Sequence, residues 1–210
     1  MPAADQNRRP LKTRSSQWAR RVAGILVSSR LSPDQISMLS IVVAATGAFA
    51  LLRAQLPWNL IVCAVCIQLR LACNMLDGMV AVEGGKKSPV GSLYNEVPDR
   101  IADSVFIVAA GYAAHLPWLG WLGALLAALT AYIRVLGGSL GFAQDFRGPM
   151  AKPHRMAALT LGCLLAALEQ ALWGSQYALQ IALWVIAIGS LATCIARTRA
   201  LAQLLRARTG

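Results

Sequence analysis

Long apolar stretches separated by short polar segments dominate the chain after its first 34 residues. A helix that crosses a lipid bilayer needs about 20 consecutive, mostly apolar residues. Proline stands at the expected first helical turn in three stretches, at Pro33 after Ser32, at Pro57 and at Pro117. The pattern predicts an all-α integral membrane protein with six transmembrane helices. The predicted helices cover residues 35–53, 57–82, 98–115, 117–140, 153–173 and 176–197.

A shorter amphipathic pattern precedes the first predicted span. The apolar residues that recur at helical spacing within residues 14–31 are Trp18, Val22, Ile25 and Leu26. Arginines occupy the polar positions between them, which predicts an interfacial helix lying among the lipid headgroups. The alternative is a basic leader that is disordered except for a short helical end. Residues 1–13 are expected to be a disordered basic leader, and residues 32–210 form the predicted six-helix domain.

The composition agrees with the bilayer as the solvent of this chain. Of the 210 residues, 57% are hydrophobic and 14% are charged, and the mean hydropathy is +0.54. These values lie outside the usual range of soluble domains. The five cysteines all fall inside apolar stretches, and Cys63 and Cys66 resemble half of a zinc or redox site in spacing only. We therefore expect buried structural thiols.

The net charge of +11 indicates which way the chain is inserted. Basic residues gather near both termini and in two connections, between the second and third and between the fourth and fifth predicted helices. Cytoplasmic segments of membrane proteins carry such an excess of Lys and Arg. We expect both termini and the polar segment 83–100 on the cytoplasmic side of the inner membrane. A nucleic-acid partner is the weaker interpretation, because no aromatic-basic surface motif accompanies the charge.

Carboxylate and amide side chains are concentrated around the polar segment. Five of the nine acidic residues fall from Asp77 to Asp103. Charged groups in or beside a spanning helix are energetically costly, so we expect these residues to serve a function. Asn74 and Asp77 share one helix face, whereas Asn95, Asp99 and Asp103 share another. Two oxygen-rich faces opposed across a short connection suit a hard divalent cation, Mg²⁺ or Mn²⁺.

Basic side chains are predicted to lie near the same end of the helices. Arg134 falls inside the fourth predicted helix, Lys152 and Arg155 open the fifth, and Arg70 lies one turn before Asn74. Phosphoryl transfer depends on positioning and charge stabilisation, so cations are expected beside a metal site that performs it. The alternative for Lys152 and Arg155 is ordinary anchoring at the cytoplasmic surface.

The acidic segment resembles the signature of the CDP-alcohol phosphotransferases, D-x2-D-G-x2-A-R-x8-9-G-x3-D-x3-D. The residues that match it in register are Asp77, Gly78, Ala81, Gly91 and Asp99. The segment Pro33-x-x-Ile36-Ser37 is similar to the start of the family's first helix. The resemblance implies an enzyme of phospholipid biosynthesis that transfers a phosphatidyl group from CDP-diacylglycerol to an alcohol and releases CMP. Residues 32–210 are then the catalytic domain.

The resemblance also implies roles for individual residues. The signature aspartates hold two divalent ions on the CDP pyrophosphate, and the last, Asp99 here, is the proposed catalytic base. The implied metal ligands are Asn74, Asp77, Asn95 and Asp99. The implied CDP-lipid-binding residues are Pro33, Ser37, Gly78, Ala81 and Gly91. The implied acceptor-phosphate residues are Arg134, Lys152 and Arg155, which suit a phosphorylated alcohol such as glycerol 3-phosphate or a polyol phosphate. The family resemblance further suggests a homodimer.

Three positions depart from the signature. Asn74 and Asn95 replace its first and third Asp, and Val82 replaces its Arg. An amide keeps a carbonyl ligand but contributes no negative charge, so we expect a weaker two-ion site, down to a single tightly bound ion. The alternative is a degenerate homologue that binds CDP-lipid or a partner without turnover. A small transporter is disfavoured, because no pair of broken helices occurs in corresponding halves.

Overall fold

A computed structural model describes residues 32–83, 85 and 90–209, together with the single positions 17, 21, 22 and 24. Within these residues the chain forms six long helices and no strand. They are α2 (Pro33–Leu51), α3 (Pro57–Glu83), α4 (Gly91–Ala113), α5 (Pro117–Ser139), α6 (Lys152–Trp173) and α7 (Tyr177–Thr209). The prediction of an all-α chain is confirmed for this part of the sequence.

The start signals read from the sequence lie where the helices begin. Ser32 caps α2 through a reciprocal pair of hydrogen bonds with Gln35. The backbone N–H of Gln35 donates to Ser32 Oγ at 3.2 Å, and the backbone N–H of Ser32 donates to Gln35 Oε1 at 2.9 Å. Pro33 and Pro117 occupy the first turns of α2 and α5, where a missing N–H costs nothing. Gly174 ends α6 with a left-handed backbone, at φ 70°.

Five of these helices are long and apolar enough to cross a membrane. They are Pro33–Leu51, Pro57–Val82, Pro117–Ser139, Lys152–Trp173 and Tyr177–Arg208. The remaining helix, α4, corresponds to the predicted span 98–115 but begins earlier, at Gly91, because the signature segment is itself helical. Its first half carries four charged residues, which set it apart from the other five. These are Glu96, Asp99, Arg100 and Asp103.

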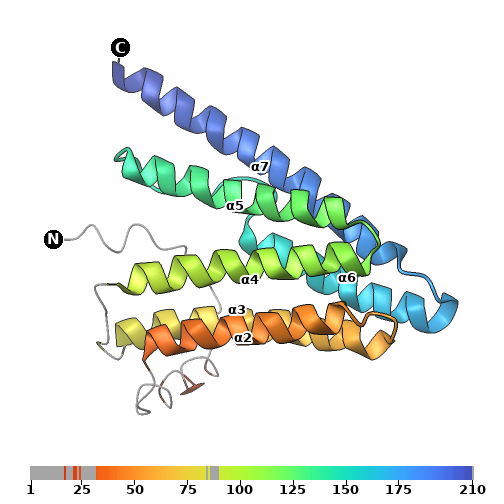
Figure 1. Cartoon of the computed structure of the whole chain (residues 1–210). Coiled ribbons are helices and arrows are strands. Elements are labelled where there is room, and N and C mark those ends of the chain that lie inside the picture. The colour runs from red at the N-terminus through yellow and green to blue at the C-terminus, as the bar shows by residue number, and fades with distance from the viewer. Residues whose placement is uncertain are drawn as a thin grey trace.

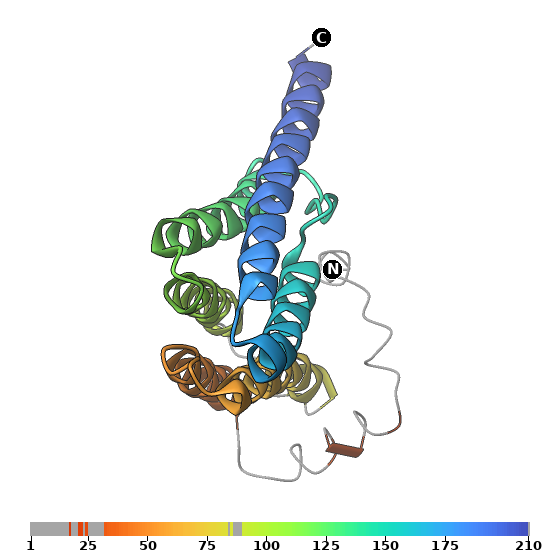
Figure 2. The ribbon, with the colours of Figure 1, turned by 90° about the vertical axis from the view of Figure 1, so that its right-hand side faces the viewer.

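The helices run beside one another, with their connections gathered at the two ends of the bundle (Figure 1). The α2–α3, α4–α5 and α6–α7 connections lie at one end, whereas the ends of α3 and α5 and the C-terminus point the other way. This alternation is the one that the charge pattern predicts. At 33 residues α7 is about 50 Å long, and its C-terminal part extends away from the other helices (Figure 2).

The core joins α2, α3 and α4 on one side to α5, α6 and α7 on the other. Its largest apolar members include Leu51, Ile67, Phe106, Leu119 and Leu183, all fully or almost fully buried. Small residues let α4 and α5 approach closely, since a Cβ on Gly111 would lie 2.7 Å from Gly120 Cα. Four of the five cysteines are buried and all five are free thiols, as expected.

The predictions for residues 1–13 and 14–31 fall outside the described residues, apart from the single positions named above. Among those, Val22 is one of the apolar positions of the predicted interfacial helix. It packs against Met75, Leu76 and Met79 near the end of α3. This contact places one apolar residue of the leader beside the helix that carries Asn74 and Asp77.

Candidate functional site

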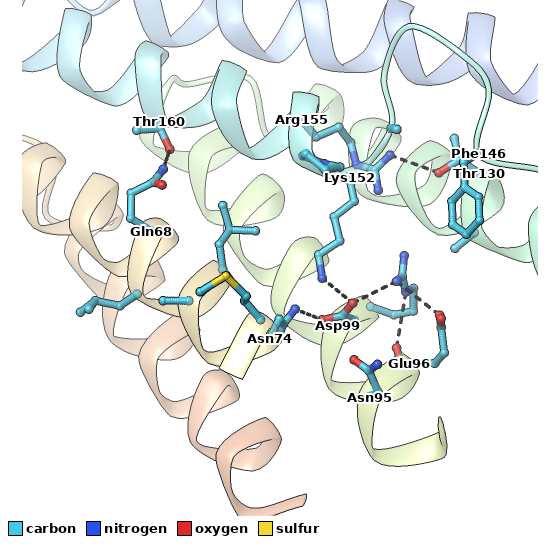
Figure 3. A pocket seen from close by; sticks show the side chains of 18 of the residues that line it. Gln68, Asn74, Asn95, Glu96, Asp99, Thr130, Phe146, Lys152, Arg155 and Thr160 are labelled. Atoms are coloured by element: carbon cyan, nitrogen blue, oxygen red, sulfur yellow. Dashed lines mark hydrogen bonds and ion pairs between the residues drawn. The ribbon is translucent and has the colours of Figure 1, made fainter. Parts of the chain in front are cut away.

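A cavity of about 900 Å³ lies among α3, α4, α5, α6 and α7, close to the ends of α3 and α5 (Figure 3). Its wall is apolar where Val65 and Leu69 of α3 and Leu164 of α6 lie, and polar towards the first turns of α4 and α6. Six of the residues that the sequence singled out line it: Asn74, Asn95, Asp99, Arg134, Lys152 and Arg155. The structure therefore brings three of the four predicted metal ligands, one of which is the predicted base, and the three predicted phosphate-binding residues into one cavity.

Asp99 is the meeting point of the polar wall. Its Oδ1 accepts from the Asn74 amide and, at 3.0 Å, from Arg70 Nη2. Its Oδ2 accepts from the Lys152 ammonium and, at 3.4 Å, from Arg100 Nη2. The carboxylate is thus held from α3, α4 and α6, and Figure 3 shows the Asn74 and Lys152 side chains converging on it. Asp99 is only 8% exposed, so these contacts replace most of its hydration.

A buried ion-pair network lies behind Asp99. Arg70, Asp103 and Arg155 are 0%, 2% and 1% exposed. Arg70 Nη2 lies 2.9 Å from Asp103 Oδ1, and Arg155 Nη2 lies 3.4 Å from Asp103 Oδ2. Arg155 also donates to Thr130 Oγ1 at 3.1 Å and to the Met150 carbonyl at 2.8 Å. Buried charges persist in proteins when they are paired in this way, so the network ties α3, α4, α5 and α6 together.

Asp77 occupies a separate environment between α2 and α3. It is 4% exposed, and Ser37 Oγ donates to its Oδ2 at 2.5 Å. Its Oδ1 is buried and has no hydrogen-bond partner among the described residues. Of the predicted CDP-lipid-binding residues, Ser37 is therefore the one that contacts a predicted metal ligand. Neither Asp77 nor any of the predicted CDP-lipid-binding residues lines the large cavity. Those residues are Pro33, Ser37, Gly78, Ala81 and Gly91.

The donor atoms available for a metal ion follow from these contacts. Among the described residues, no three His, Cys, Asp or Glu side chains gather closely enough to hold one. The free buried oxygen of Asp77 and the amide oxygens of Asn74 and Asn95 are hard donors of the kind that Mg²⁺ and Mn²⁺ prefer. These oxygens are the candidate ligands for one divalent ion, whose coordination a bound substrate would complete.

Arg134 lies on the cavity wall between α4 and the α5–α6 connection. Its guanidinium donates to Glu96 Oε1 at 2.6 Å and to Gln144 Oε1 at 2.5 Å, and it lies 5.5 Å from the centre of the Phe146 ring. Arg100 approaches Glu96 at 3.4 Å as well. Sequence reasoning missed Glu96 as a partner, although it lies one residue from Asn95 on the same helix face as Arg100.

Arg197 is the second residue of the cavity that sequence reasoning missed. It was interpreted as one of the basic residues that flank the last span, but it is 5% exposed and lines the cavity. Its Nη1 donates to the Thr130 carbonyl at 2.6 Å and its Nε to the Arg147 carbonyl at 2.9 Å. The available signal was its place four residues after Thr193, on the buried face of α7.

The connection before α6 is held on α7 by close packing and by hydrogen bonds, including the one from Arg197 to the Arg147 carbonyl. Met150 N donates to Thr193 Oγ1 at 2.9 Å, and that hydroxyl donates to the Gly189 carbonyl at 2.8 Å. Gly148 has φ 113°, and a Cβ on it would lie 2.5 Å from Thr193 Cγ2. These contacts set where α6 begins, and therefore where Lys152 and Arg155 enter the cavity. His154, by contrast, is exposed and contacts the Pro149 carbonyl.

Two curated relatives show how this chain compares with known proteins. It is 33% identical over 172 residues to the archaetidylinositol phosphate synthase of Aeropyrum pernix, which covers 80% of this chain and 84% of that protein. It is 27% identical over 186 residues to the phosphatidylinositol phosphate synthase of Streptomyces avermitilis, which covers 83% and 74% of the two chains.

The fold has counterparts among solved structures. The phosphatidylinositol phosphate synthase of Mycobacterium tuberculosis with CDP-DAG bound superposes with a TM-score of 0.76 at 22% identity, over 89% of this chain and 94% of that one. The same protein in complex with manganese and citrate gives 0.74 at 21% identity, over 87% and 88%. Residues 30–196, which include α2 to α6 and most of α7, match the family described as CDP-alcohol phosphatidyltransferase. The chain therefore belongs to the CDP-alcohol phosphatidyltransferase family.

Proposed function

We propose that this metal-dependent phosphatidyltransferase transfers the phosphatidyl group of CDP-diacylglycerol to inositol phosphate and releases CMP. The observation that carries the proposal is the cavity in which the Asp99 carboxylate meets cationic side chains from α3, α4 and α6, with further arginines from α5 and α7 on the same wall. The names of the relatives favour inositol phosphate over glycerol 3-phosphate as the phosphorylated acceptor.

The basic wall suits the phosphate of the acceptor. Arg134, Lys152, Arg155 and Arg197 all line the cavity, and guanidinium groups bind phosphate oxygens through paired N–H donors. Lys152 has three N–H donors and uses one on Asp99, so the same ammonium can reach the carboxylate and the acceptor phosphate together. That arrangement would place an acceptor hydroxyl beside Asp99.

Asp99 is proposed as the group that takes the proton of that hydroxyl. The Arg100 guanidinium lies 3.4 Å from Oδ2, farther than a strong hydrogen bond, so the hydroxyl can most easily enter at this place. As the proton moves to Oδ2, the hydroxyl oxygen bonds to the lipid-side phosphorus. The bond from that phosphorus to the oxygen shared with the cytidine-bearing phosphate breaks, and CMP leaves with that oxygen. The products are phosphatidylinositol phosphate and CMP.

The cytidine end of the donor is proposed to lie beside the metal. Asp77, with the amide oxygens of Asn74 and Asn95, would hold the ion, and Asp99 is kept for proton transfer. When bound, the metal supplies charge neutralisation for the pyrophosphate. The proposed CDP-lipid-binding residues, Pro33, Ser37, Gly78, Ala81 and Gly91, belong to the adjoining ends of α2, α3 and α4. The contact of Ser37 with Asp77 supports this placement.

The insertion of the chain is part of the proposal. We take α4 as the sixth membrane span, since it packs between α2 and α5 and is 23 residues long. Residues 14–31 would lie as an interfacial helix, and both termini and the charged end of the cavity would face the cytoplasm at the inner membrane. The extensive apolar surface left exposed along the helices suits lipid contact and a homodimer.

The test is CMP release by purified protein supplied with CDP-diacylglycerol, Mg²⁺ or Mn²⁺ and a panel of alcohols. Inositol phosphate is expected to support release, with inositol and glycerol 3-phosphate as the comparison acceptors. Asp99→Asn should abolish it, whereas Asp145→Asn, outside the cavity lining, should not. The alternative is a homologue that binds CDP-lipid without turnover, and the loss of two signature carboxylates at Asn74 and Asn95 supports it. CDP-lipid binding without CMP release for every acceptor would establish that alternative.

A further inference from the structure

The contact between Asn74 and Asp99 has a consequence for how many metal ions the site holds. The Asn74 amide donates directly to Asp99 Oδ1. An aspartate in place of Asn74 would put two carboxylate oxygens against each other, which is tolerable only with a proton or a cation between them. With asparagine, the N–H group makes that contact without any ion.

The other oxygen of Asp99 is in contact with a cation that belongs to the chain. The Lys152 ammonium lies on Oδ2, and Arg70 and Arg100 approach the same carboxylate at 3.0 and 3.4 Å. Lys152 enters from α6, whose start is pinned by the contact of Met150 with Thr193. Arg70 and Arg100 each have a second carboxylate, Asp103 and Glu96, whereas Lys152 contacts the Asp99 carboxylate. A divalent ion added at Asp99 would have to approach the Lys152 ammonium, and like charges at such distances repel strongly.

The environment of Asp77 is the opposite. A neutral hydroxyl, Ser37, donates to its Oδ2, and its Oδ1 is buried with no hydrogen-bond partner among the described residues. A buried carboxylate oxygen in that condition is costly unless a cation or donor reaches it. The four signature positions carry two carboxylates, Asp77 and Asp99, and two amides. Of the two carboxylates, Asp99 is neutralised by the chain and Asp77 is not.

We propose that Lys152 and the Asn74 amide take the place of one divalent ion at Asp99, so that the site binds a single ion, at Asp77. This inference rests on the proposed function and adds that the chain supplies the second cation itself. Lys152 is then a positioning residue for Asp99 besides a phosphate-binding one. Asn at position 74 and the contact of Lys152 with Asp99 are expected to occur together. An aspartate at position 74 would place a second carboxylate against Asp99, and without Lys152 the Oδ2 of Asp99 would lose its ammonium partner.

The experiment counts Mn²⁺ on the purified protein in lipid nanodiscs with CDP-diacylglycerol present, by equilibrium dialysis and by electron paramagnetic resonance. The wild-type chain is expected to bind one ion and to give an uncoupled six-line spectrum. Asn74→Asp combined with Lys152→Met restores the carboxylate and removes the built-in cation, so a second ion should bind. Two ions about 4 Å apart couple magnetically, and the six lines should broaden and collapse.

Matched controls separate these effects from added charge or lost lysine. Asn59→Asp introduces the same change on a half-buried residue at the other end of α3, and Arg147→Met removes an exposed cation outside the cavity lining. Both should leave one ion. Should the double variant fail to fold, as judged by its elution and CDP-lipid binding, the nearly isosteric Asn74→Asp variant decides the matter. It should show a second ion or an unfolding temperature that rises steeply with Mn²⁺.

Two coupled ions on the wild-type chain would overturn the proposal, and so would a single ion on every folded variant. The number of bound ions tests this proposal, whereas CMP release tests the proposed function, so the two can fail separately. One ion without CMP release would retain the built-in cation and reject the enzyme activity. Two ions with CMP release would retain the activity and reject the built-in cation.

Discussion

The buried network around Arg70 permits a quantitative prediction about stability. Arg70 is fully buried, lies 3.0 Å from Asp99 Oδ1 and 2.9 Å from Asp103 Oδ1, and donates to the Asp99 carbonyl at 2.9 Å. Arg70→Met keeps an unbranched side chain in the same space and removes the charge. Asp103 would then retain only the 3.4 Å contact with Arg155. Removing one partner of a buried ion pair costs about 3–5 kcal/mol, which is the expected loss of unfolding free energy.

A double-variant cycle distinguishes the ion pair from lost packing. Asp103→Asn alone leaves Arg70 without one of its partners and should also destabilise the protein. The combination with Arg70→Met removes both charges of the Arg70–Asp103 pair, so its cost should fall below the sum of the two by about 1–3 kcal/mol. Reversible unfolding in mixed micelles, followed by tryptophan fluorescence, gives the three free energies.

Arg53→Met serves as the reference for this cycle. Arg53 is an exposed arginine near the other end of the bundle, where it stacks 5.3 Å from the Phe49 ring centre. Its substitution should cost less than about 1 kcal/mol. A loss of under 1 kcal/mol for Arg70→Met, or costs that simply add in the double variant, would refute the idea that this ion pair ties α3 to α4.

Three further predictions concern the site and its supports. Asp99→Asn should lower the rate of CMP release by about 100- to 10,000-fold with little change in CDP-lipid binding, and equal rates would remove Asp99 from proton transfer. Thr193→Val removes the acceptor of Met150 N and should cost about 1–3 kcal/mol of stability. It should also raise the KM for the acceptor, because the start of α6, which carries Lys152, is then no longer held by this hydrogen bond. An unchanged KM would count against that coupling. Chelation with EDTA should abolish CMP release, and added Mg²⁺ or Mn²⁺ should restore it.

The helices were predictable from the sequence because their signals are local. Apolar length, the Ser32 cap and the prolines at first turns depend only on neighbours along the chain, and α2, α3 and α5 begin where those signals stand. The start of α4 was misplaced by seven residues, from 98 to Gly91. The reason is that its charged first half does not look like a membrane span, although Asn95, Asp99 and Asp103 had been placed on one helical face.

The candidate site was predictable as a set of residues but not as a set of contacts. Family resemblance and the cost of charge beside a bilayer singled out Asp99, Lys152 and Arg155, which line one cavity. Arg197 was missed, since basic residues after a last span usually serve as anchors, and only its burial on α7 distinguishes it. Glu96 was missed because its partner, Arg134, lies on a different helix.

By itself, the sequence determined that this chain is a helical membrane protein with a polar segment, rich in Asp and Asn, between its second and third predicted spans. Hydrophobic length and the spacing of Asp and Asn along a helix are properties of neighbours, so they can be read without a fold. Only the tertiary structure decided which charges neutralise one another. It gave the two signature carboxylates different partners, with Asp99 in contact with Arg70, Lys152 and the Asn74 amide and Asp77 in contact with the Ser37 hydroxyl. Those partners come from different helices, and helix packing alone brings them within hydrogen-bonding distance.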